Sequence, residues 1–204
     1  VADELNSNVE ILPSAVFVRD VPVKDYSIEN EKIVIGWVGG KINLPYLQLM
    51  QPVLKKLSES YPIELCIVCD EGLEMDGVDV RFVPWTLEGQ DTEIAKFDIG
   101  IMPLADSLHA SGKCAYKALQ YMAAAVPAVV SDVGVNRDVL QNGQLGGVAE
   151  TVDDFYAELE QLIKDPDKRK EMGLASRKLV EAQYSIEAVA AQLAQILKAR
   201  ISKN

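Results

Sequence analysis

The hexapeptide I-V-I-G-W-V, residues Ile33–Val38, is the stretch that decides the fold. It is almost continuously apolar, as expected of a parallel strand whose sheet is covered on both faces. A second run of this kind, I-E-L-C-I-V-C at Ile63–Cys69, follows a segment of helical period at Leu44–Ser60. A strand, a helix and a second strand in this order predict a βαβ unit with parallel strands.

The same alternation continues along the chain. Further strands are predicted at Val78–Val83, Asp98–Met102 and Ala128–Ser131. A further helix is predicted at Gly112–Ala125. Alternating strands and helices of this kind predict an α/β fold, with a Rossmann-like parallel sheet that carries helices on both faces.

The two ends of the chain differ from this pattern. Residues 1–30 have no sustained period, so we interpret them as a lead-in arm with one short strand at Ala15–Arg19. Three helices are predicted after Thr151, Asp165 and Ser185, because each of these residues can cap a helix and precedes apolar residues at helical spacing. The expected organisation is therefore an arm at 1–30, a sheet domain at 31–184 and a last helix at 185–204.

Composition narrows the function. The 204 residues are 49% hydrophobic and 25% charged, the balance of a globular protein. The net charge of −11 argues against partners that are polyanions, so we expect neither nucleic acid nor an anionic membrane surface. No apolar run approaches the ~20 residues that span a bilayer, and the first thirty residues contain no apolar run that could serve as a signal peptide.

The cysteines and the single histidine offer no metal site. Cys66 and Cys69 have C-x-x-C spacing, but alternation along a strand places them on opposite faces, so we interpret them as core residues. Three cysteines favour a reducing compartment, and we expect the protein to be cytoplasmic. No Cys/His cluster is present, and the acidic loop 70–79 lacks the spacing of a calcium loop, so no metal is predicted.

Open parallel sheets bind ligands at the carboxyl ends of their strands, near helix N-termini. This rule selects the loops 39–43, 84–90, 103–113 and 131–137. The loop at 103–113 leads into the predicted helix Gly112–Ala125, which has an apolar stripe and, beside it, a polar stripe. The predicted apolar stripe is Cys114, Ala118, Met122 and Ala125, and the polar stripe is Lys113, Lys117 and Gln120.

Lys113 and Lys117 lie in the first turns of that predicted helix. A cation there opposes the helix dipole at a cost of up to ~1 kcal/mol. A pyrophosphate bound by both lysines and by the free amides of Gly112–Ala115 would turn this cost into a net stabilisation. The alternative is that the lysines are solvated or paired with Asp106 or Asp132.

Longer runs resemble a known family. D-I-G-I-M-P-L begins at Asp98, and G-K-C-A-Y-K-A-L-Q-Y-M-A-A-A-V-P-A-V-V-S-D-V-G-V-N-R-D-V-L spans Gly112–Leu140. A Gly-rich strand follows, and then a helix with D-P-D-K-R-K-E-M-G-L-A-S-R from Asp165. In order and spacing, from Lys32 to Ser185, the sequence resembles the C-terminal, donor-binding half of GT-B glycosyltransferases of group 1, the family 4 retaining type.

The resemblance implies a domain that binds a nucleotide-activated sugar without a further cofactor. It implies transfer with retention to an acceptor held by an N-terminal domain that is missing here. Residues 1–30 would be a linker or the end of that domain, and residues 185–204 a helix that crosses back to it. The first residue is Val1 rather than Met, so we expect a fragment of a longer chain, inactive alone. Any membrane contact would be peripheral and made through the missing domain.

The resemblance also assigns site residues. The family's E-x7-E signature falls on Gly112 and Gln120, so both glutamates are missing, although Gln120 can still hydrogen-bond a ribose diol. Nothing in the four selected loops resembles a D-x-D metal clamp, and the resemblance implies a metal-independent transferase of the hexosyl type. Ala115 and Ala125 stand where glycine is usual in the similar branch, and a methyl group at 115 would weaken donor binding. The residues assigned to the donor phosphates and sugar are Gly39, Gly40, Lys41, Gly112, Lys113, Cys114 and Lys117, and those assigned to the ribose and base are Gln120 and Trp85.

Several alternatives stay open. Trp85 could hold the base or pack against the strand end, and His109 could touch the donor sugar or face solvent. Asn136 is predicted to cap the next helix, after a turn in which Gly134 permits an unusual backbone angle. Because both signature glutamates are lost, the protein could also be a non-catalytic relative used for binding or assembly. A third possibility is a sugar-nucleotide epimerase of the same architecture, which needs no acceptor.

Overall fold

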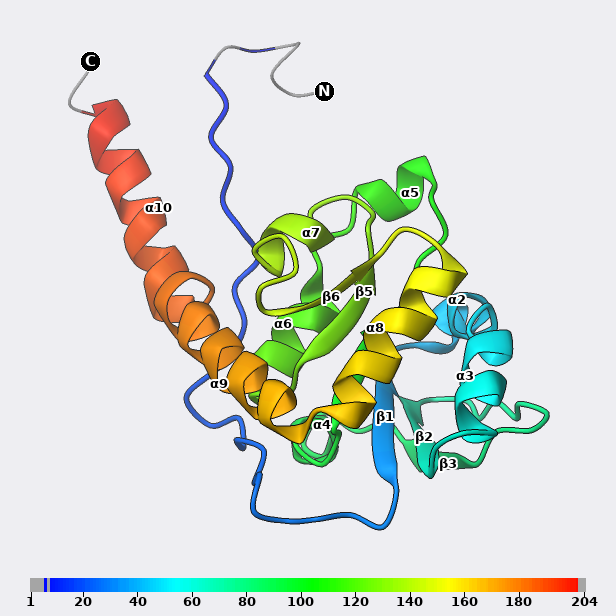
Figure 1. Cartoon of the computed structure of the whole chain (residues 1–204). Helices are drawn as coiled ribbons and strands as arrows, with labels where there is room; N and C mark the ends of the chain where they lie inside the picture. The colour runs from blue at the N-terminus through cyan, green and yellow to red at the C-terminus, as the bar shows by residue number, and fades with distance from the viewer. Residues whose placement is uncertain (1–5, 7, 202–204) are drawn as a thin grey trace.

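A six-stranded sheet forms the centre of the computed structural model, which describes residue 6 and residues 8–201. The strand order is β3-β2-β1-β4-β5-β6, and all neighbouring strands are parallel (Figure 1). The strands are β1 (Ile33–Val38), β2 (Ile63–Cys69), β3 (Val80–Pro84), β4 (Ile99–Met102), β5 (Ala128–Ser131) and β6 (Gly146–Ala149). The predicted Rossmann-like α/β fold is confirmed.

Helices cover both faces of this sheet. One face packs against α2 (Leu44–Gln48), α3 (Gln51–Ser58) and α8 (Val152–Lys164), and the other against α4 (Gln90–Ile94), α6 (Tyr116–Ala123) and α9 (Pro166–Gln183). The remaining elements are η1 (Lys41–Asn43), α5 (Leu108–Ser111), α7 (Asn136–Val139) and α10 (Ile186–Ile201). The predicted coverage of both faces is therefore observed.

Each face has its own buried cluster of apolar side chains. Along β1, Ile35 and Trp37 belong to one cluster and Val38 belongs to the other. Cys66 and Cys69 also fall into opposite clusters, as predicted. Burial raises the pKa of the Cys66 thiol to about 11, which makes it a poor source of thiolate.

Two predicted helices are shorter than expected. The segment Leu44–Ser60 is broken into α2 and α3, because Pro52 has no amide for a helical hydrogen bond and stands in the first turn of α3. The helix predicted at Gly112–Ala125 begins only at Tyr116, because Ala115 has a left-handed backbone with φ of 56°. Cys114 therefore lies in a turn and is exposed, so its place on a buried stripe was wrong.

The three C-terminal helices begin at the predicted caps. The Thr151 hydroxyl accepts a hydrogen bond from the Asp154 amide, and the Asp165 carboxylate accepts one from the Lys168 amide. The Ser185 hydroxyl likewise accepts one from an amide in the first turn of α10. Side chains that accept from free helix amides explain why these starts were predictable.

The turn between β5 and α7 differs in part from its prediction. Gly134 does adopt a left-handed backbone, with φ of 61°. Asn136, however, lies inside α7 and is not its cap, because its side-chain nitrogen donates to the Ser131 carbonyl, 2.9 Å away. This hydrogen bond ties the start of α7 to the end of β5.

The N-terminal arm packs on the domain. The strand predicted at Ala15–Arg19 is reduced to a single bridge between Val16 and Ser185, because the arm meets the junction of α9 and α10 there and not a strand. Val16, Val18 and Val21 are buried. Ion pairs of Arg19 with Glu187 and of Arg200 with Glu10 hold the arm alongside α10 (Figure 1).

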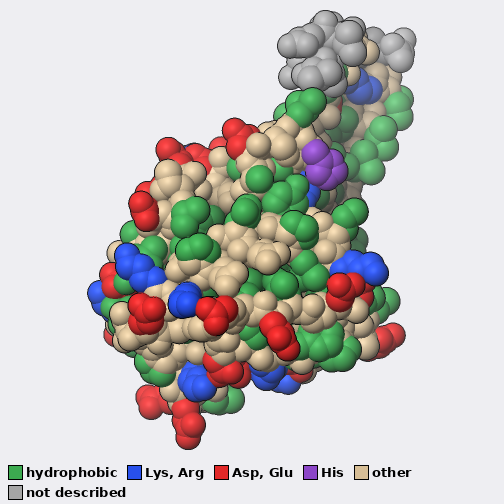
Figure 2. All heavy atoms as spheres, turned by 90° about the vertical axis from the view of Figure 1, so that its right-hand side faces the viewer, with side chains coloured by type: hydrophobic (Ala, Val, Ile, Leu, Met, Phe, Trp, Pro, Cys, Tyr) green, Lys and Arg blue, Asp and Glu red, His purple; other side chains and the backbone are tan. Residues whose placement is uncertain are grey.

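The last helix extends beyond the sheet domain. On α10, Val189 is buried, but Leu193, Leu197 and Ile201 are exposed. Within the described part of the chain, no helix combines the length and hydropathy that crossing a bilayer requires. On the face viewed in Figure 2, acidic and basic side chains are interspersed over the lower part.

Candidate functional site

A cleft of about 730 Å³ lies at the carboxyl ends of the strands, a volume typical of small-molecule sites. Its walls come from the ends of β1 to β4 and from α4 and α6. β1 and β4 are neighbours from which the chain continues in opposite directions across the sheet, the place where open α/β sheets bind ligands. The lining residues are Val38, Gly39, Gly40, Asp70, Trp85, Gln90, Met102, Gly112, Lys113, Cys114, Tyr116, Lys117 and Gln120.

Of the predicted site residues, Lys41 alone does not line this cleft. Its ammonium group lies 3.6 Å from the Glu71 carboxylate, and its side chain is 64% exposed. The backbone explains this placement, because the Lys41 amide donates to the Asp70 carboxylate over 2.7 Å and fixes the turn after β1. The other predicted residues from β1, β3 and α6, together with the turn before α6, are brought together.

Two ammonium groups in the cleft have no carboxylate partner. Lys113 donates to the side-chain oxygen of Asn43 over 3.1 Å, and Lys117 lies 5.9 Å from the ring centroid of Trp37. In the described part of the chain, no carboxylate oxygen lies within 4.0 Å of either lysine nitrogen. The alternative pairing with Asp132 is not observed, because that carboxylate accepts from the Arg137 guanidinium over 2.9 Å.

The surroundings of both lysines disfavour their protonated, charged form. Burial lowers the pKa of Lys113, and burial together with the nearby charge of Lys113 lowers the pKa of Lys117. Asp70 is the one acidic side chain among the described residues that line the cleft, and its pKa is lowered chiefly by the hydrogen bond from the Lys41 amide. An anionic ligand would stabilise the two desolvated ammonium groups, so the cleft favours an anion.

Backbone groups add to this preference. The first helical hydrogen bond of α6 runs from the Leu119 amide to the Ala115 carbonyl. Among the described residues, no acceptor is found for the amides of Tyr116, Lys117 and Ala118, because Ala115 carries no capping oxygen. These free amides carry the positive end of the helix dipole, beside the two lysines.

Gly39 allows Lys117 to reach this position. A Cβ atom at residue 39 would lie 2.8 Å from the Lys117 side chain and 2.8 Å from the Trp37 ring. Any larger residue would therefore displace the lysine or the indole. The absence of a side chain at the end of β1 is part of how the cleft holds its cation.

The alanines that replace the usual glycines have left-handed backbones. The φ angles are 56° at Ala115 and 58° at Ala125. Both residues are fully buried, and Ala115 does not line the cleft. That the methyl group at 115 weakens donor binding stays a prediction. The cost of alanine here is backbone strain, since L-residues disfavour this region.

Trp85 and two glutamines form another part of the wall. The Trp85 side chain is 43% exposed, and its indole nitrogen donates to the side-chain oxygen of Gln90 over 3.1 Å. The Gln120 side-chain nitrogen donates to the same oxygen over 3.2 Å. Gln90 was missed in the sequence, because it begins a helix of only five residues and glutamine has no distinctive pattern there.

Other candidates lie outside the cleft or offer no metal site. His109 is on α5, is exposed and does not line the cleft. Over the residues that the structure describes, no group of three His, Cys, Asp or Glu side chains could hold a metal ion. The cleft therefore combines two cations that have no carboxylate partner among the described residues, the free amides of α6, an indole ring and two side-chain amides.

Comparison with known proteins identifies the family. A family model described as "Glycosyl transferases group 1" matches residues 32–165. The chain therefore belongs to the group 1 glycosyltransferases. A sequence search of curated proteins found no match.

Solved structures show the same fold. The chain is similar to a sucrose-phosphate synthase from Thermosynechococcus elongatus, with a TM-score of 0.70 and 13% identity over 96% of this chain and 53% of that one. It is similar to WaaG, a glycosyltransferase involved in lipopolysaccharide biosynthesis, with a TM-score of 0.70 and 16% identity over 90% and 55% of the two chains.

A third structure corresponds to this chain in extent. It is the C-terminal domain of a group 1 family glycosyl transferase from Francisella tularensis, with a TM-score of 0.63 and 13% identity over 84% of this chain and 100% of that one. The chain spans about half the length of the first two structures. It thus has the fold of the C-terminal half of a GT-B glycosyltransferase.

Proposed function

We propose that this chain is the donor-binding half of a retaining glycosyltransferase and holds a nucleotide-activated sugar of the hexose type. Membership of the group 1 family supports sugar transfer in general. The observation that carries the proposal is the pair Lys113 and Lys117, two desolvated ammonium groups without a carboxylate partner in the described chain, which line one cleft. A diphosphate would supply the negatively charged partner that both ammonium groups lack.

Other residues of the cleft suit the ribose, the base and the phosphates of such a donor. Gln120 lies one turn beyond Lys117 on α6, where its amide can bond the ribose hydroxyls. The exposed face of Trp85 offers a surface on which a base can stack. Gly39 leaves room for the Lys117 side chain, and Gly40, where an added Cβ atom would meet nothing within 4 Å, leaves room for phosphate oxygens.

The proposed chemistry needs no metal. In sugar transfer, negative charge grows on the departing nucleoside diphosphate, and each preorganised donor aimed at such charge typically contributes ~3–4 kcal/mol. The two lysines and the free amides of α6 would supply these donors. The acceptor would be held by an N-terminal domain outside this chain, so the chain alone would bind the donor without transferring the sugar. An exposed thiol at Cys114 fits a reducing, cytoplasmic compartment.

A thermal-shift measurement tests this proposal. Millimolar UDP, GDP or ADP should raise the Tm of the chain, because a ligand at a hundred times its Kd stabilises by about 2.7 kcal/mol. The double variant Lys113→Met with Lys117→Met should lose the shift. The matched control, Lys170→Met with Lys178→Met, removes two exposed lysines of α9 and should keep it. No shift with any of the three nucleotides contradicts the proposal.

A second candidate is a non-catalytic relative that keeps the fold for binding or assembly. The observation that favours it is at Gly112 and Gln120, where the family signature has glutamates and this chain has neither. The test is a longer protein that includes the N-terminal domain. Nucleotide binding without donor hydrolysis or sugar transfer would favour this candidate over the enzyme.

A further inference from the structure

In the cleft, one side-chain oxygen atom accepts hydrogen bonds from two neighbouring side chains. The side-chain oxygen Oε1 of Gln90 accepts from Nε1 of Trp85 over 3.1 Å and from Nε2 of Gln120 over 3.2 Å. Trp85 follows β3, Gln90 begins α4 and Gln120 lies on α6, so the shared atom joins three separate elements. All three side chains line the cleft.

The chemistry of the indole fixes the direction of both amides. An indole nitrogen only donates, so Gln90 must turn its oxygen toward Trp85. The same oxygen lies beside Gln120, which must therefore present its NH₂ group to Gln90. The carbonyl oxygen of Gln120 is left over, and among the described residues no donor to it is found.

We propose that Gln90 is a positioning residue for the ligand. By accepting from both neighbours, Gln90 holds the Trp85 ring in the cleft wall and fixes Gln120 with its carbonyl oxygen free to accept. A carbonyl oxygen binds only donors, so it selects a ligand with hydroxyl groups at that place over one without them. This inference rests on the proposed function, in which those hydroxyls are the ribose diol of a nucleoside diphosphate.

The experiment compares two ligands that share base and diphosphate. Calorimetric titration gives the Kd of UDP, GDP or ADP, whichever binds, and the Kd of its 2′,3′-dideoxy counterpart. For the wild-type chain, the dideoxy ligand should bind about tenfold more weakly, the effect of about one hydrogen bond. Because both ligands carry the same phosphates, the ratio of the two Kd values cancels any general change of charge.

Two variants of Gln90 separate positioning from packing. Gln90→Met keeps the length of the side chain but removes the acceptor, so Gln120 becomes free to rotate and the ratio should fall by roughly three- to tenfold. Gln90→Glu keeps an acceptor oxygen for both neighbours and should retain the ratio. In Gln120→Met the two Kd values should become equal, so that their ratio is about one. Adding Gln90→Met to this variant should not change the ratio further, because the two residues act as one unit.

The outcomes are distinct. An unchanged ratio in Gln90→Met, or an equal loss in Gln90→Met and Gln90→Glu, overturns the inference. Equal Kd values of the two ligands for the wild-type chain overturn it while leaving the proposed function intact. If the wild-type chain binds none of the nucleotides, the proposed function fails and this inference fails with it. A Tm of unliganded Gln90→Met close to that of wild type shows that the variant is folded.

Discussion

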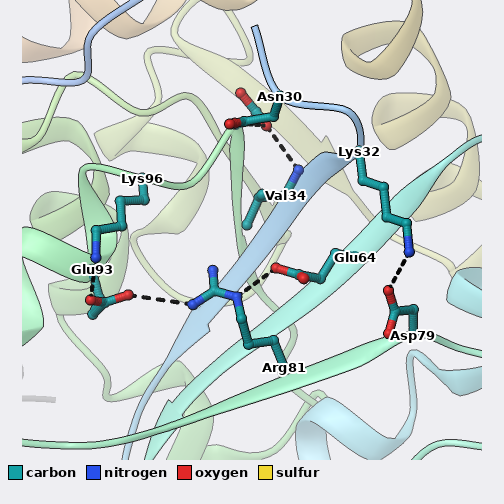
Figure 3. A network of polar contacts seen from close by, with 9 residues as sticks. Asn30, Lys32, Val34, Glu64, Asp79, Arg81, Glu93 and Lys96 are labelled. Carbon is teal, nitrogen blue, oxygen red and sulfur yellow. Dashed lines mark hydrogen bonds and ion pairs between the residues drawn. The ribbon is translucent and has the colours of Figure 1, made fainter. Parts of the chain in front are cut away.

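The cleft and the opposite, amino-terminal edge of the sheet treat positive charge in opposite ways. At the amino ends of the strands, the Arg81 guanidinium donates to Glu64 over 2.7 Å, and Lys32 pairs with Asp79 over 2.7 Å (Figure 3). At the carboxyl ends, Lys113 and Lys117 line a cleft with no carboxylate within pairing distance in the described chain. The cations drawn at the amino ends thus have carboxylate partners, whereas the two lysines of the cleft have none among the described residues.

The amino end of the sheet also contains a buried ion pair, between Lys24 and Asp98. The ammonium group of Lys24 lies 2.9 Å from the Asp98 carboxylate, and both side chains are less than 10% exposed. The other carboxylate oxygen of Asp98 accepts from the Val34 amide over 2.8 Å. This pair fastens the arm to the starts of β1 and β4. The described residues thus supply a carboxylate partner to this buried cation, but not to the two lysines of the cleft.

Breaking the buried pair should have the largest effect. Lys24→Met leaves the Asp98 carboxylate buried without its cation, and removing one partner of such a pair typically costs about 3–5 kcal/mol of unfolding free energy. Denaturant unfolding measures this loss. The matched control is Lys32→Met, whose pair is about half exposed and should change the unfolding free energy by less than about 1 kcal/mol. Equal losses in the two variants would contradict the contrast between buried and exposed pairs.

At the carboxyl end, loss of a lysine should act in the opposite direction on stability. Lys117→Met removes a desolvated cation that is repelled by Lys113, so the unliganded chain should gain up to about 1 kcal/mol of unfolding free energy. The same variant should bind a nucleoside diphosphate at least tenfold more weakly, because a charge-assisted hydrogen bond is lost.

Denaturant unfolding and calorimetric titration on the same samples measure the two effects of Lys117→Met. Lys178→Met, an exposed lysine of α9, is the control and should change neither quantity appreciably. A variant that loses both stability and affinity would show that Lys117 is a structural residue and not one held in readiness for an anion.

The backbone beside the cleft supplies a smaller test. Ala115→Gly should raise the unfolding free energy by about 0.5–1 kcal/mol, because glycine adopts a φ of 56° without the strain that an L-residue suffers. Ala118→Gly, within the right-handed part of α6, should lower it by about 1 kcal/mol or more. Thermal unfolding distinguishes the two signs. A loss of stability in Ala115→Gly would mean that the buried methyl group contributes more than the strain costs.

Most of the fold was predictable because its strands are buried on both faces. Runs such as Ile33–Val38 and Ile63–Cys69 are apolar throughout, which leaves little ambiguity. β6 reads G-G-V-A and has no such run, so only the resemblance to a family suggested it. The start of α6 was misplaced because the left-handed turn at Ala115 is formed by an alanine, which gives no local sign of it.

The site was predictable where topology alone decides it. Lys113 and Lys117 follow β4, and the rule for carboxyl ends of parallel strands brings them to the cleft. Lys41 follows the same rule but turns away, because its amide is held by Asp70, twenty-nine residues further along the chain. The role of Gln90 depends on a hydrogen bond from Trp85, across the loop before α4, and on one from Gln120, on α6. Contacts of this kind are set by the tertiary structure and leave no pattern in the sequence.

A last expected effect is the pH dependence of binding, which follows from the lowered pKa values of Lys113 and Lys117. The pKa values of Lys113 and Lys117 are lowered in the unliganded fold, whereas a bound diphosphate would raise them. The complex then holds more protons than the free protein at alkaline pH, so affinity should fall as pH rises through the lowered pKa values. The fall is limited to a factor of ten per pH unit for each lysine that loses its proton.

The unfolding free energy of the unliganded chain should change in the opposite direction and rise with pH. Because these lysine pKa values are lower in the folded than in the unfolded chain, the destabilising contribution is complete below the folded value and is relieved as pH rises toward the ordinary lysine value of 10.5. Titration of affinity above pH 8, where the terminal phosphate is fully ionised and no longer changes charge, isolates the protein's contribution. Affinity that stays level until the ordinary lysine range would show that the two ammonium groups are not desolvated in the cleft, and the contrast between the two ends of the sheet would then lose its electrostatic basis.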